Sequence, residues 1–321
     1  MVCAKPARSE RVRPGGRGSS VRVAALAAAT GYLHRLYAEA VSDGATLIEL
    51  TRSRGWILRR PIPGTSWTDA TGPYPLFACR DWSQLGRDIE EIEGDPVSVS
   101  VVADPFGEHD MEGLGRAGWT VKPFKEHYVV ELDRQPAELL SRSHRRQVRT
   151  ALAAVAVELT ATAEWSDDWA KLYALLVRRH CIRGPAAFSE LSLRRQLSVP
   201  GMVMFRASVD GVTAGINLWS VHSSVAYYHL GASSGEGYRR SASHALMWAA
   251  VEHFAGLVDV LNLGGGPGLE QGASGLTEFK RRWATTSRTA YFLSRILDSD
   301  RYGMLVRARG NRTTPYFPAY R

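Results

Sequence analysis

One lysine of this chain lies where its charge could serve a reaction. The sequence has 35 arginines but only five lysines, and Lys280 follows a glycine-rich stretch that begins with Gly264, Gly265 and Gly266. A lysine ammonium is a compact point charge that can stabilise an oxyanion, and glycines allow a substrate to approach the backbone closely. By residue type alone, a core-packing helix with Lys280 facing water and a simple glycine turn are the commoner arrangements.

The strand over residues 225–233 carries two candidate side chains. His229 has an unperturbed pKa of about 6.5, so it can accept a proton from an amine. A packed, hydrogen-bonded histidine is the more frequent case, and deprotonation by the substrate itself stays open. Strict alternation predicts Tyr227 and His229 on one face and Tyr228 and Leu230 on the other, with one face lining a cleft.

Arg239 and Arg240 are candidates for binding phosphate, and they equally fit an ordinary basic loop. The net charge of +8 permits a polyanionic partner such as RNA, and part of the arginine excess is explained by a GC-rich genome. A four-arginine helix face (Arg142, Arg145, Arg146 and Arg149) is most simply a solvated surface, with a phosphate-binding stripe as the alternative.

Several chemistries are not indicated. The three cysteines form no spaced pair, and no His/Cys cluster has ligand spacing, so neither a disulfide framework nor a metal site is predicted. No Ser-His-Asp or Cys-His arrangement points to a covalent acyl-enzyme. The sequence has no apolar run of about 18 residues, so we expect no membrane span. The low cysteine count suits a reducing compartment, so we expect a cytoplasmic protein.

The elements that must position these residues fall into two similar halves of an α/β chain. After a disordered basic tail over 1–20 and a helix over 21–36, the first half has strands at 45–50, 55–62, 75–82, 96–106, 118–124 and 127–132. The second half has three antiparallel strands at 202–209, 212–221 and 225–233, a helix at 241–256, a strand at 258–264, a helix at 276–284 and a strand at 286–296. Asp210-Gly211 predicts a two-residue hairpin turn.

The strand and helix order of the second half matches the GNAT acyltransferase core, in which two strands part and admit an acyl donor. Segments 226–248 and 260–284 resemble the Fem-type branch of that superfamily. The most specific piece is the closing pattern of Gly275, Leu276, Phe279, Lys280 and Arg281. This resemblance covers most of residues 45–295.

The resemblance implies a tandem GNAT-like fold, with mixed central sheets flanked by helices. We expect an N-terminal GNAT-like half over 21–135, a C-terminal GNAT domain with the cleft over 136–297, and a C-terminal tail over 298–321. It also implies an aminoacyltransferase that takes its donor from aminoacyl-tRNA, without a tightly bound cofactor. The acceptor would be an amine of a peptidoglycan precursor or of a natural-product intermediate, as in antibiotic biosynthesis.

Residue roles follow from the same resemblance. Lys280 would contact the aminoacyl ester and support the transition state, while Phe279 would position it. Asp69 and Tyr74 lie in a segment that resembles a family segment near the acceptor cleft. The expected substrate-binding set is Arg239, Arg240, Tyr228, Gly264, Gly265, Gly266, Asp69 and Tyr74.

Two alternatives stay open. An acyl-CoA-dependent GNAT would carry an Arg/Gln-x-x-Gly-x-Gly/Ala loop before its helix, but counting from Arg239 or Arg240 places Ala242 or Ser243 at the required glycine. A non-catalytic GNAT-like protein that binds RNA or a partner is the second alternative. The sequence does not distinguish oligomeric states.

Overall fold

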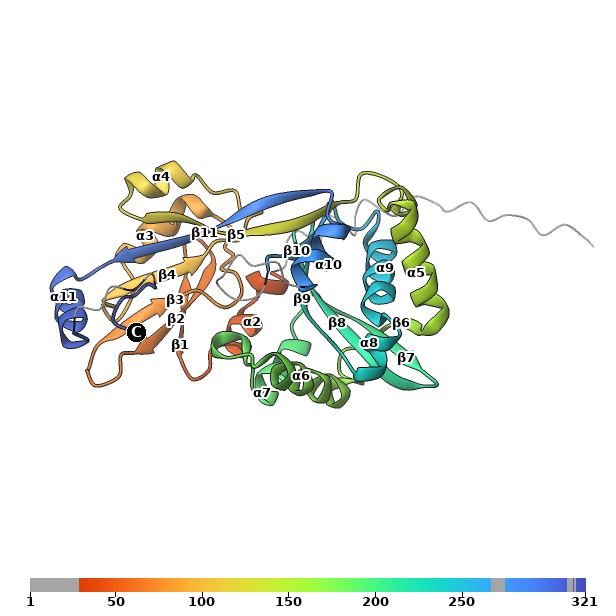
Figure 1. Cartoon of the computed structure of the whole chain (residues 1–321). Coiled ribbons are helices and arrows are strands. Elements are labelled where there is room, and N and C mark those ends of the chain that lie inside the picture. The colour runs from red at the N-terminus through yellow and green to blue at the C-terminus, as the bar shows by residue number, and fades with distance from the viewer. Residues whose placement is uncertain (1–28, 267–274, 311–313, 315) are drawn as a thin grey trace, which may run out of the picture.

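The computed structural model describes residues 29–266, 275–310, 314 and 316–321. Its strands form one 11-stranded mixed sheet in the order β1-β2-β3-β4-β11-β5-β10-β9-β8-β7-β6, with helices on both sides (Figure 1). The expected α/β class is therefore confirmed. None of the described helices is long and apolar enough to cross a membrane.

The bounds of the elements are as follows. The strands are β1 (Thr46–Leu50), β2 (Gly55–Pro61), β3 (Thr68–Thr71), β4 (Ser98–Val102), β5 (Thr120–Glu131), β6 (Ala156–Thr160), β7 (Met202–Val209), β8 (Val212–His222), β9 (Val225–Ser233), β10 (Val260–Gly264) and β11 (Thr286–Ile296). The α-helices are α2 (Arg35–Ala40), α3 (Leu85–Glu90), α4 (Met111–Arg116), α5 (Arg142–Ala154), α6 (Ser166–His180), α7 (Glu190–Leu197), α8 (Gly235–Arg239), α9 (Ala242–Phe254), α10 (Gly275–Trp283) and α11 (Ser299–Ala308). Short 3-10 helices are η1 (Gly31–Leu33), η2 (Trp82–Gln84), η3 (Pro136–Glu138) and η4 (Gly184–Ala186).

The second half follows the predicted order. Strands β6 to β9 are antiparallel neighbours, and β10 returns parallel to β9 after α9. At the β7–β8 hairpin, Asp210 and Gly211 both have positive φ, which the short hairpin turn requires. One face of this sheet packs against α5 and α9, and the other against α6, α7, α2 and η1.

The first half has its own core beneath α3 and α4. Trp82, Ile89 and Leu114 from these helices and η2 pack on Ile57 and Val99 of the strands. On the opposite side, α11 packs through Leu305, in a cluster with Ile62, Val97 and Tyr320. The segment 298–321, expected as a tail, therefore contains a ten-residue helix and a docked end.

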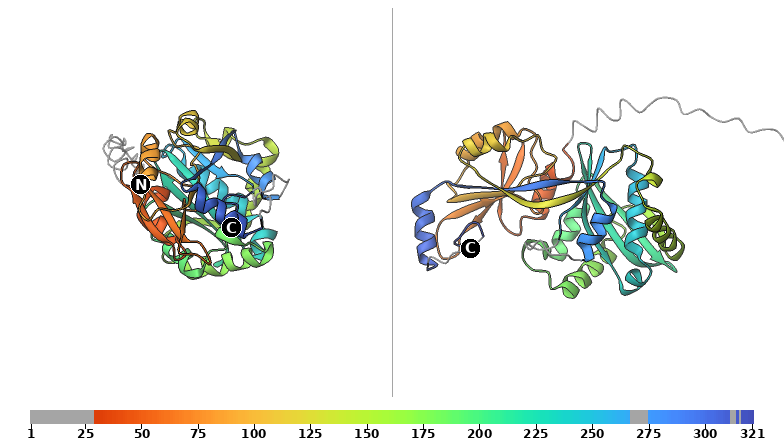
Figure 2. Two further views of the ribbon diagram at one scale, coloured as in Figure 1. Left: turned by 90° about the vertical axis from the view of Figure 1, so that its left-hand side faces the viewer. Right: turned by 45° about the horizontal axis from the view of Figure 1, so that its top comes forward.

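Two long strands, β5 and β11, pair with each other and join the halves (Figure 2). The end of β11 pairs with β4 of the first half, while the end of β5 pairs with β10 of the second. Strand β5 thus lies between β10 and β11. The expected boundary at 135/136 divides the chain by sequence position only. Each half of the sheet includes a strand from the other side of that boundary. The domain bounds stay a prediction.

A buried carboxylate also holds the halves together. Asp104, just after β4, accepts hydrogen bonds from the Tyr227 hydroxyl at 2.7 Å and from His222 Nε2 at 3.1 Å. Burial alone would raise the pKa of Asp104, but these two partners and the amide of Phe106 hold it below its ordinary value.

Two local predictions are wrong. Residues 75–82 form no strand: Leu76 and Ala78 pack toward the second half and Phe77 toward the first, so this apolar segment is buried on both sides without regular strand pairing. The third strand is instead Thr68–Thr71. The two strands expected over 118–132 are the single strand β5, which pairs with β11 and, at its end, with β10.

The N-terminal prediction is only partly covered. Residues 1–28, including the expected tail and most of the expected helix over 21–36, lie outside the described residues. The described part of that helix is divided into η1 and α2, because His34 is extended and its side chain accepts a hydrogen bond from the Leu36 amide.

Candidate functional site

The parallel strands β9 and β10 part where the second half meets β5. They pair over Val225–Tyr227 and Val260–Asn262. Beyond these residues β9 continues to Ser233, paired with β8, whereas β10 ends at Gly264. The two strands therefore part as expected, and Tyr228 is the first β9 residue that does not pair with β10; the place where they part is called the opening below.

Lys280 projects from α10 into this opening. Its side chain is buried, and Nζ donates a hydrogen bond to the Gly265 carbonyl at 2.7 Å. Nζ also lies 5.9 Å from the centre of the Tyr228 ring, within cation–π range. Burial, and secondarily the charge of Lys125, lowers the pKa of Lys280 to about 7.

A second lysine reaches the same backbone segment. Lys125 of β5 donates from Nζ to the Gly266 carbonyl at 3.0 Å, so two consecutive carbonyls accept from two ammonium groups. Burial lowers the pKa of Lys125 as well. Among the described residues, neither lysine has a carboxylate partner. Two ammonium groups that have no carboxylate partner in the described part of the chain favour an anionic group or a developing negative charge.

His127 and Asn262 complete the mouth of the opening. The amide oxygen of Asn262 lies 3.1 Å from His127 Nδ1 and accepts the Gly264 amide at 2.9 Å. Burial and the charge of Lys280 lower the pKa of His127 to about 4, so the ring is neutral at pH 7. Because Asn262 supplies an acceptor, Nδ1 carries the proton and Nε2 offers a lone pair.

The glycines of the opening have distinct roles. Gly264 has a φ of +73°, and an extra β10 residue, Leu263, precedes it opposite β5. A Cβ on Gly265 would lie 3.1 Å from the Glu126 carbonyl, and one on Gly266 2.8 Å from the Thr277 hydroxyl. Close packing thus requires the small residues that present their carbonyls to the two lysines.

Phe279 lies next to Lys280 but packs against the core. Its ring is 5.0 Å from His244 and 6.3 Å from Trp283, which is fully buried. The alternative of a core-packing helix with Lys280 facing water is therefore correct in one part, because Phe279 and Trp283 do face the core. Lys280 does not face water, and that part of the interpretation is wrong.

The structure does not bring His229 together with Lys280. Its Nδ1 lies 3.0 Å from the Tyr32 hydroxyl and its Nε2 2.7 Å from the Gln196 amide oxygen. Burial lowers the pKa of His229 to about 3. Both ring nitrogens are thus engaged in a buried network, on the face covered by η1 and α2.

A β-bulge in β9 changes the predicted alternation. Leu218 pairs with Leu230 while Trp219 pairs with Tyr228, so His229 is the extra residue. Tyr227 and His229 do share a face, since both rings contact Tyr32.

Tyr228 and Leu230 do not share a face, which corrects the strict alternation. Tyr228 packs in the cluster beneath α9 and Leu230 in the cluster beneath α6. The bulge therefore leaves Tyr228 alone of this pair facing Lys280. A Cβ on Gly231 would meet the Tyr228 hydroxyl, so glycine provides the space for that ring.

Arg239 and Arg240 lie at the end of α8, where a loop was expected. Both pair with the Glu236 carboxylate, Arg240 through Nε at 2.7 Å. A Cβ on Gly237 would lie 2.0 Å from the Ala214 carbonyl, so this glycine allows α8 to pack on β8. The space before α9 thus holds a short helix whose two arginines share one carboxylate partner, Glu236.

Asp69 and Tyr74 lie away from the lysines. Asp69 of β3 is buried between two guanidiniums, with Arg60 Nε at 3.0 Å and Arg321 Nε at 2.6 Å. The Tyr74 backbone carbonyl accepts the Tyr37 hydroxyl at 2.5 Å, and its ring lies 5.9 Å from Phe188. Asp69 anchors the C-terminus, while Tyr74 lies between the halves.

Sequence reasoning missed Lys125, His127 and Asn262. The first two lie on a strand expected to end near them, more than 130 residues before the segment they contact. The scarcity of lysine was an available signal for Lys125, because it applies to all five lysines equally.

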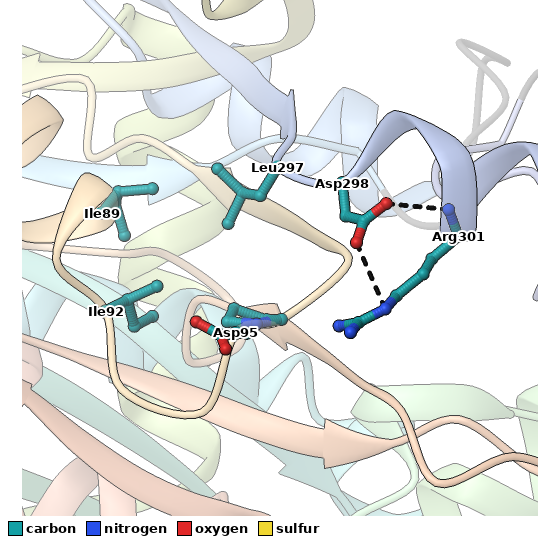
Figure 3. A pocket seen from close by; sticks show the side chains of 7 residues that line it. Ile89, Ile92, Asp95, Leu297, Asp298 and Arg301 are labelled. Atoms are coloured by element: carbon teal, nitrogen blue, oxygen red, sulfur yellow. Dashed lines mark hydrogen bonds and ion pairs between the residues drawn. The ribbon is translucent and has the colours of Figure 1, made fainter.

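A cavity of about 290 Å³ lies in the first half (Figure 3). Its lining includes Ile89, Ile92 and Leu297, and its polar groups Asp298 and Arg301 pair with each other at 3.2 Å. The carboxylate-bearing residue Asp95 also lines it. Among the described residues, no cluster of His, Cys, Asp and Glu has the arrangement of a metal site.

The chain is similar to proteins of one superfamily. Residues 140–294 match the family model of the acetyltransferase (GNAT) domain. The structure of FemX is similar with a TM-score of 0.63 and 15% identity, over 84% of this chain and 92% of FemX.

Two further solved structures have a similar fold. The C-terminal domain of a putative lysylphosphatidylglycerol synthetase from Agrobacterium fabrum has a TM-score of 0.59 and 15% identity, over 85% of this chain and 90% of that domain. L-PGS from Bacillus licheniformis has a TM-score of 0.56 and 13% identity, over 89% and 100%. No curated protein matches this chain in sequence.

Proposed function

Because residues 140–294 match the acetyltransferase (GNAT) domain and the fold is similar to that of FemX, we propose that this chain is an acyltransferase that transfers an aminoacyl group from aminoacyl-tRNA to an amine. The observation that carries the proposal is the buried Lys280, which points into the opening between β9 and β10 without a carboxylate partner among the described residues. A neighbour named lysylphosphatidylglycerol synthetase supports aminoacyl transfer as the reaction class.

The chemistry follows from the charges at the opening. The amine nitrogen attacks the ester carbonyl, a C–N bond forms, and the C–O bond to the ribose breaks. Protonated Lys280 stabilises the oxyanion that forms on the carbonyl oxygen, and exchanges its present acceptor, the Gly265 carbonyl, for that oxygen. The amine's proton ends on the leaving ribose oxygen.

We assign the acceptor side of the opening to His127. This ring is neutral, held by Asn262 and close enough to Lys280 to feel its charge. Its Nε2 lone pair can accept a hydrogen bond from the attacking amine and so orient the nitrogen toward the ester. With a pKa of about 4 it is a weak base, so orientation is its main contribution.

An acyl-CoA donor is the alternative, and the acetyltransferase description of the matching family favours it. Against it, α8 stands where a pyrophosphate-binding loop would precede α9, and Arg239 and Arg240 are engaged by Glu236. The acceptor amine, whether of a peptidoglycan precursor or of a natural-product intermediate, is part of the proposal.

The test compares donors with matched variants. Wild-type protein, Lys280→Met and Lys122→Met are titrated with a mixed aminoacyl-tRNA pool, uncharged tRNA and acetyl-CoA at two salt concentrations. We expect wild-type protein to retain charged tRNA in a salt-sensitive way and not to bind acetyl-CoA. Tight binding of acetyl-CoA without preference for charged tRNA would overturn the tRNA-dependent function.

Transfer is then measured with a peptidoglycan pentapeptide precursor and with a set of small primary amines. Lys280→Met should lower the transfer rate at least 100-fold while keeping most donor binding. Lys122 is an exposed lysine of the same β5 strand, so Lys122→Met should leave both unchanged. His127→Asn should reduce transfer with donor binding kept.

A further inference from the structure

Helix α5 presents a face made of arginine. Its outward residues Arg142, Arg145, Arg146 and Arg149, named here the α5 arginine face, recur at helical spacing and are exposed. The helix contains no acidic residue. None of the four has a carboxylate partner in the described part of the chain, whereas arginines elsewhere, such as Arg194 and Arg206, do.

The opposite side of α5 fixes this orientation. Val148 and Ala151 are buried in the cluster beneath α9, and His144 is buried between α9 and α10. The Ser141 hydroxyl caps the helix by accepting the His144 amide. The arginines therefore face outward because the helix is packed, and their separation from carboxylates is a lasting property of the surface.

The α5 arginine face adjoins the helix that carries Lys280. The His144 ring lies 4.5 Å from the Trp283 ring of α10, and burial together with the charge of Arg282 lowers the pKa of His144. Arg282 is itself exposed and extends the positive surface toward α10. At a rise of about 1.5 Å per residue, Arg146 and Arg149 follow His144 within about 8 Å along α5.

We propose that the α5 arginine face binds the phosphate backbone of the tRNA acceptor arm, next to its aminoacylated 3′ end. This rests on the proposed function, because the 3′ end must reach Lys280. Guanidiniums bind phosphate through paired N–H groups, and several along one helix neutralise successive phosphates. The face thus extends donor recognition beyond the reacting ester.

An anionic membrane surface is the other polyanion to consider, and the residues of α5 argue against it. Helices that lie on membranes pair basic residues with large apolar or aromatic ones that insert. The outward side of α5 offers only Leu152 as a large exposed apolar side chain, and no aromatic one.

The experiment compares two pairs of arginines at opposite ends of the molecule. Arg146→Gln/Arg149→Gln changes the α5 arginine face, and Arg307→Gln/Arg309→Gln removes the same charge at the end of α11 (Figure 1). Neither Arg146 nor Arg149 makes a side-chain hydrogen bond to a described residue, and glutamine keeps the helix propensity. Each variant is assayed with aminoacyl-tRNA and with the short donor 3′-aminoacyl-adenosine.

We expect the α5 double variant to lose about tenfold in kcat/KM for aminoacyl-tRNA at 0.1 M salt. The slope of log(kcat/KM) against the logarithm of the salt concentration should become shallower by roughly 1.5, because two phosphate contacts are lost. Its kcat/KM for 3′-aminoacyl-adenosine should equal that of wild type. The α11 control should match wild type with both donors.

Three results would overturn the proposal: an unchanged tRNA dependence, an equal loss with both donors, or an equal loss in the control. Binding to phosphatidylglycerol vesicles that disappears in the α5 variant while tRNA kinetics stay normal would assign the face to a membrane instead. If wild-type protein uses neither donor, the proposed function fails, which is a different result from failure of the α5 arginine face.

Discussion

The chemistry attributed to Lys280 depends on how it is enclosed. A lysine in water keeps its charge far above neutral pH, but burial lowers the pKa of Lys280 to about 7 and Lys125 contributes to that shift. Its protonation therefore changes in the range where an amine acceptor also changes. If the reaction needs the ammonium form, kcat/KM falls as pH rises through about 7, because this ratio reports the free enzyme.

Replacing Lys125 should move this fall. Lys125→Gln removes the like charge beside Lys280, so the pKa of Lys280 rises and kcat/KM stays high to a higher pH. The measurement is the pH dependence of kcat/KM for Lys125→Gln against wild type, with Lys122→Gln as the exposed control. A rate that increases through pH 7 in wild type would instead mean that neutral Lys280 reacts, as a base.

At the scale of elements, α8 shows how a single backbone contact allows a helix to form where a loop was expected. Predicted as a loop, residues 235–239 form a helix that packs on β8 and ends with Arg239 and Arg240 paired to Glu236. Such packing is possible only where a glycine faces the Ala214 carbonyl.

Two glycines of α8 provide a matched test of this contact. Gly237→Ala should lower the free energy of unfolding by about 1–3 kcal/mol, since its Cβ would overlap a backbone oxygen that has no room to move. Gly235→Ala, with only the end of the Arg239 side chain nearby, should be neutral or slightly stabilising. Urea unfolding of both variants measures the difference, and equal stabilities would contradict the packing.

Local sequence patterns predicted the elements of the second half, but they did not predict the contacts between elements that are far apart in the sequence. Alternation and hairpin chemistry identify β7, β8 and β9, because those signals act over a few residues. The bulge at His229 is set by pairing with β8, and the contact of Lys125 with Gly266 joins residues 141 apart. Lys280 was identified through a resemblance to a known family, whereas the residues around it could be identified only from the folded structure.

At the scale of the whole molecule, Asp69 ties the C-terminus to the first half. Its carboxylate accepts from Arg321 and from Arg60, and the Tyr320 hydroxyl donates to the same group at 3.3 Å. Arg321 is the last residue of the chain as given, and its side chain also bonds the Pro61 carbonyl. These contacts give Asp69 a structural task far from the lysines.

Asp69→Asn should therefore affect stability and not catalysis. Two partly exposed guanidiniums would lose their shared anion, and we expect the free energy of unfolding to fall by about 2–4 kcal/mol. The exposed Asp43→Asn is the control for loss of one carboxylate. Urea unfolding measures the first effect; a raised KM for the acceptor amine at unchanged stability would return Asp69 to the substrate-binding residues.

The paired strands β5 and β11 limit how the gene of this protein can recombine and how the chain can be divided into fragments. Each half of the sheet is completed by a strand whose remaining length belongs to the other half. The product of a gene fragment that encodes one half alone would have an open sheet edge. The unpaired backbone N–H and C=O groups of that edge could pair with another chain and cause aggregation. We therefore expect that recombination cannot replace one half without the other. Two fragments made separately should restore the protein by complementation, and neither should fold as an independent domain.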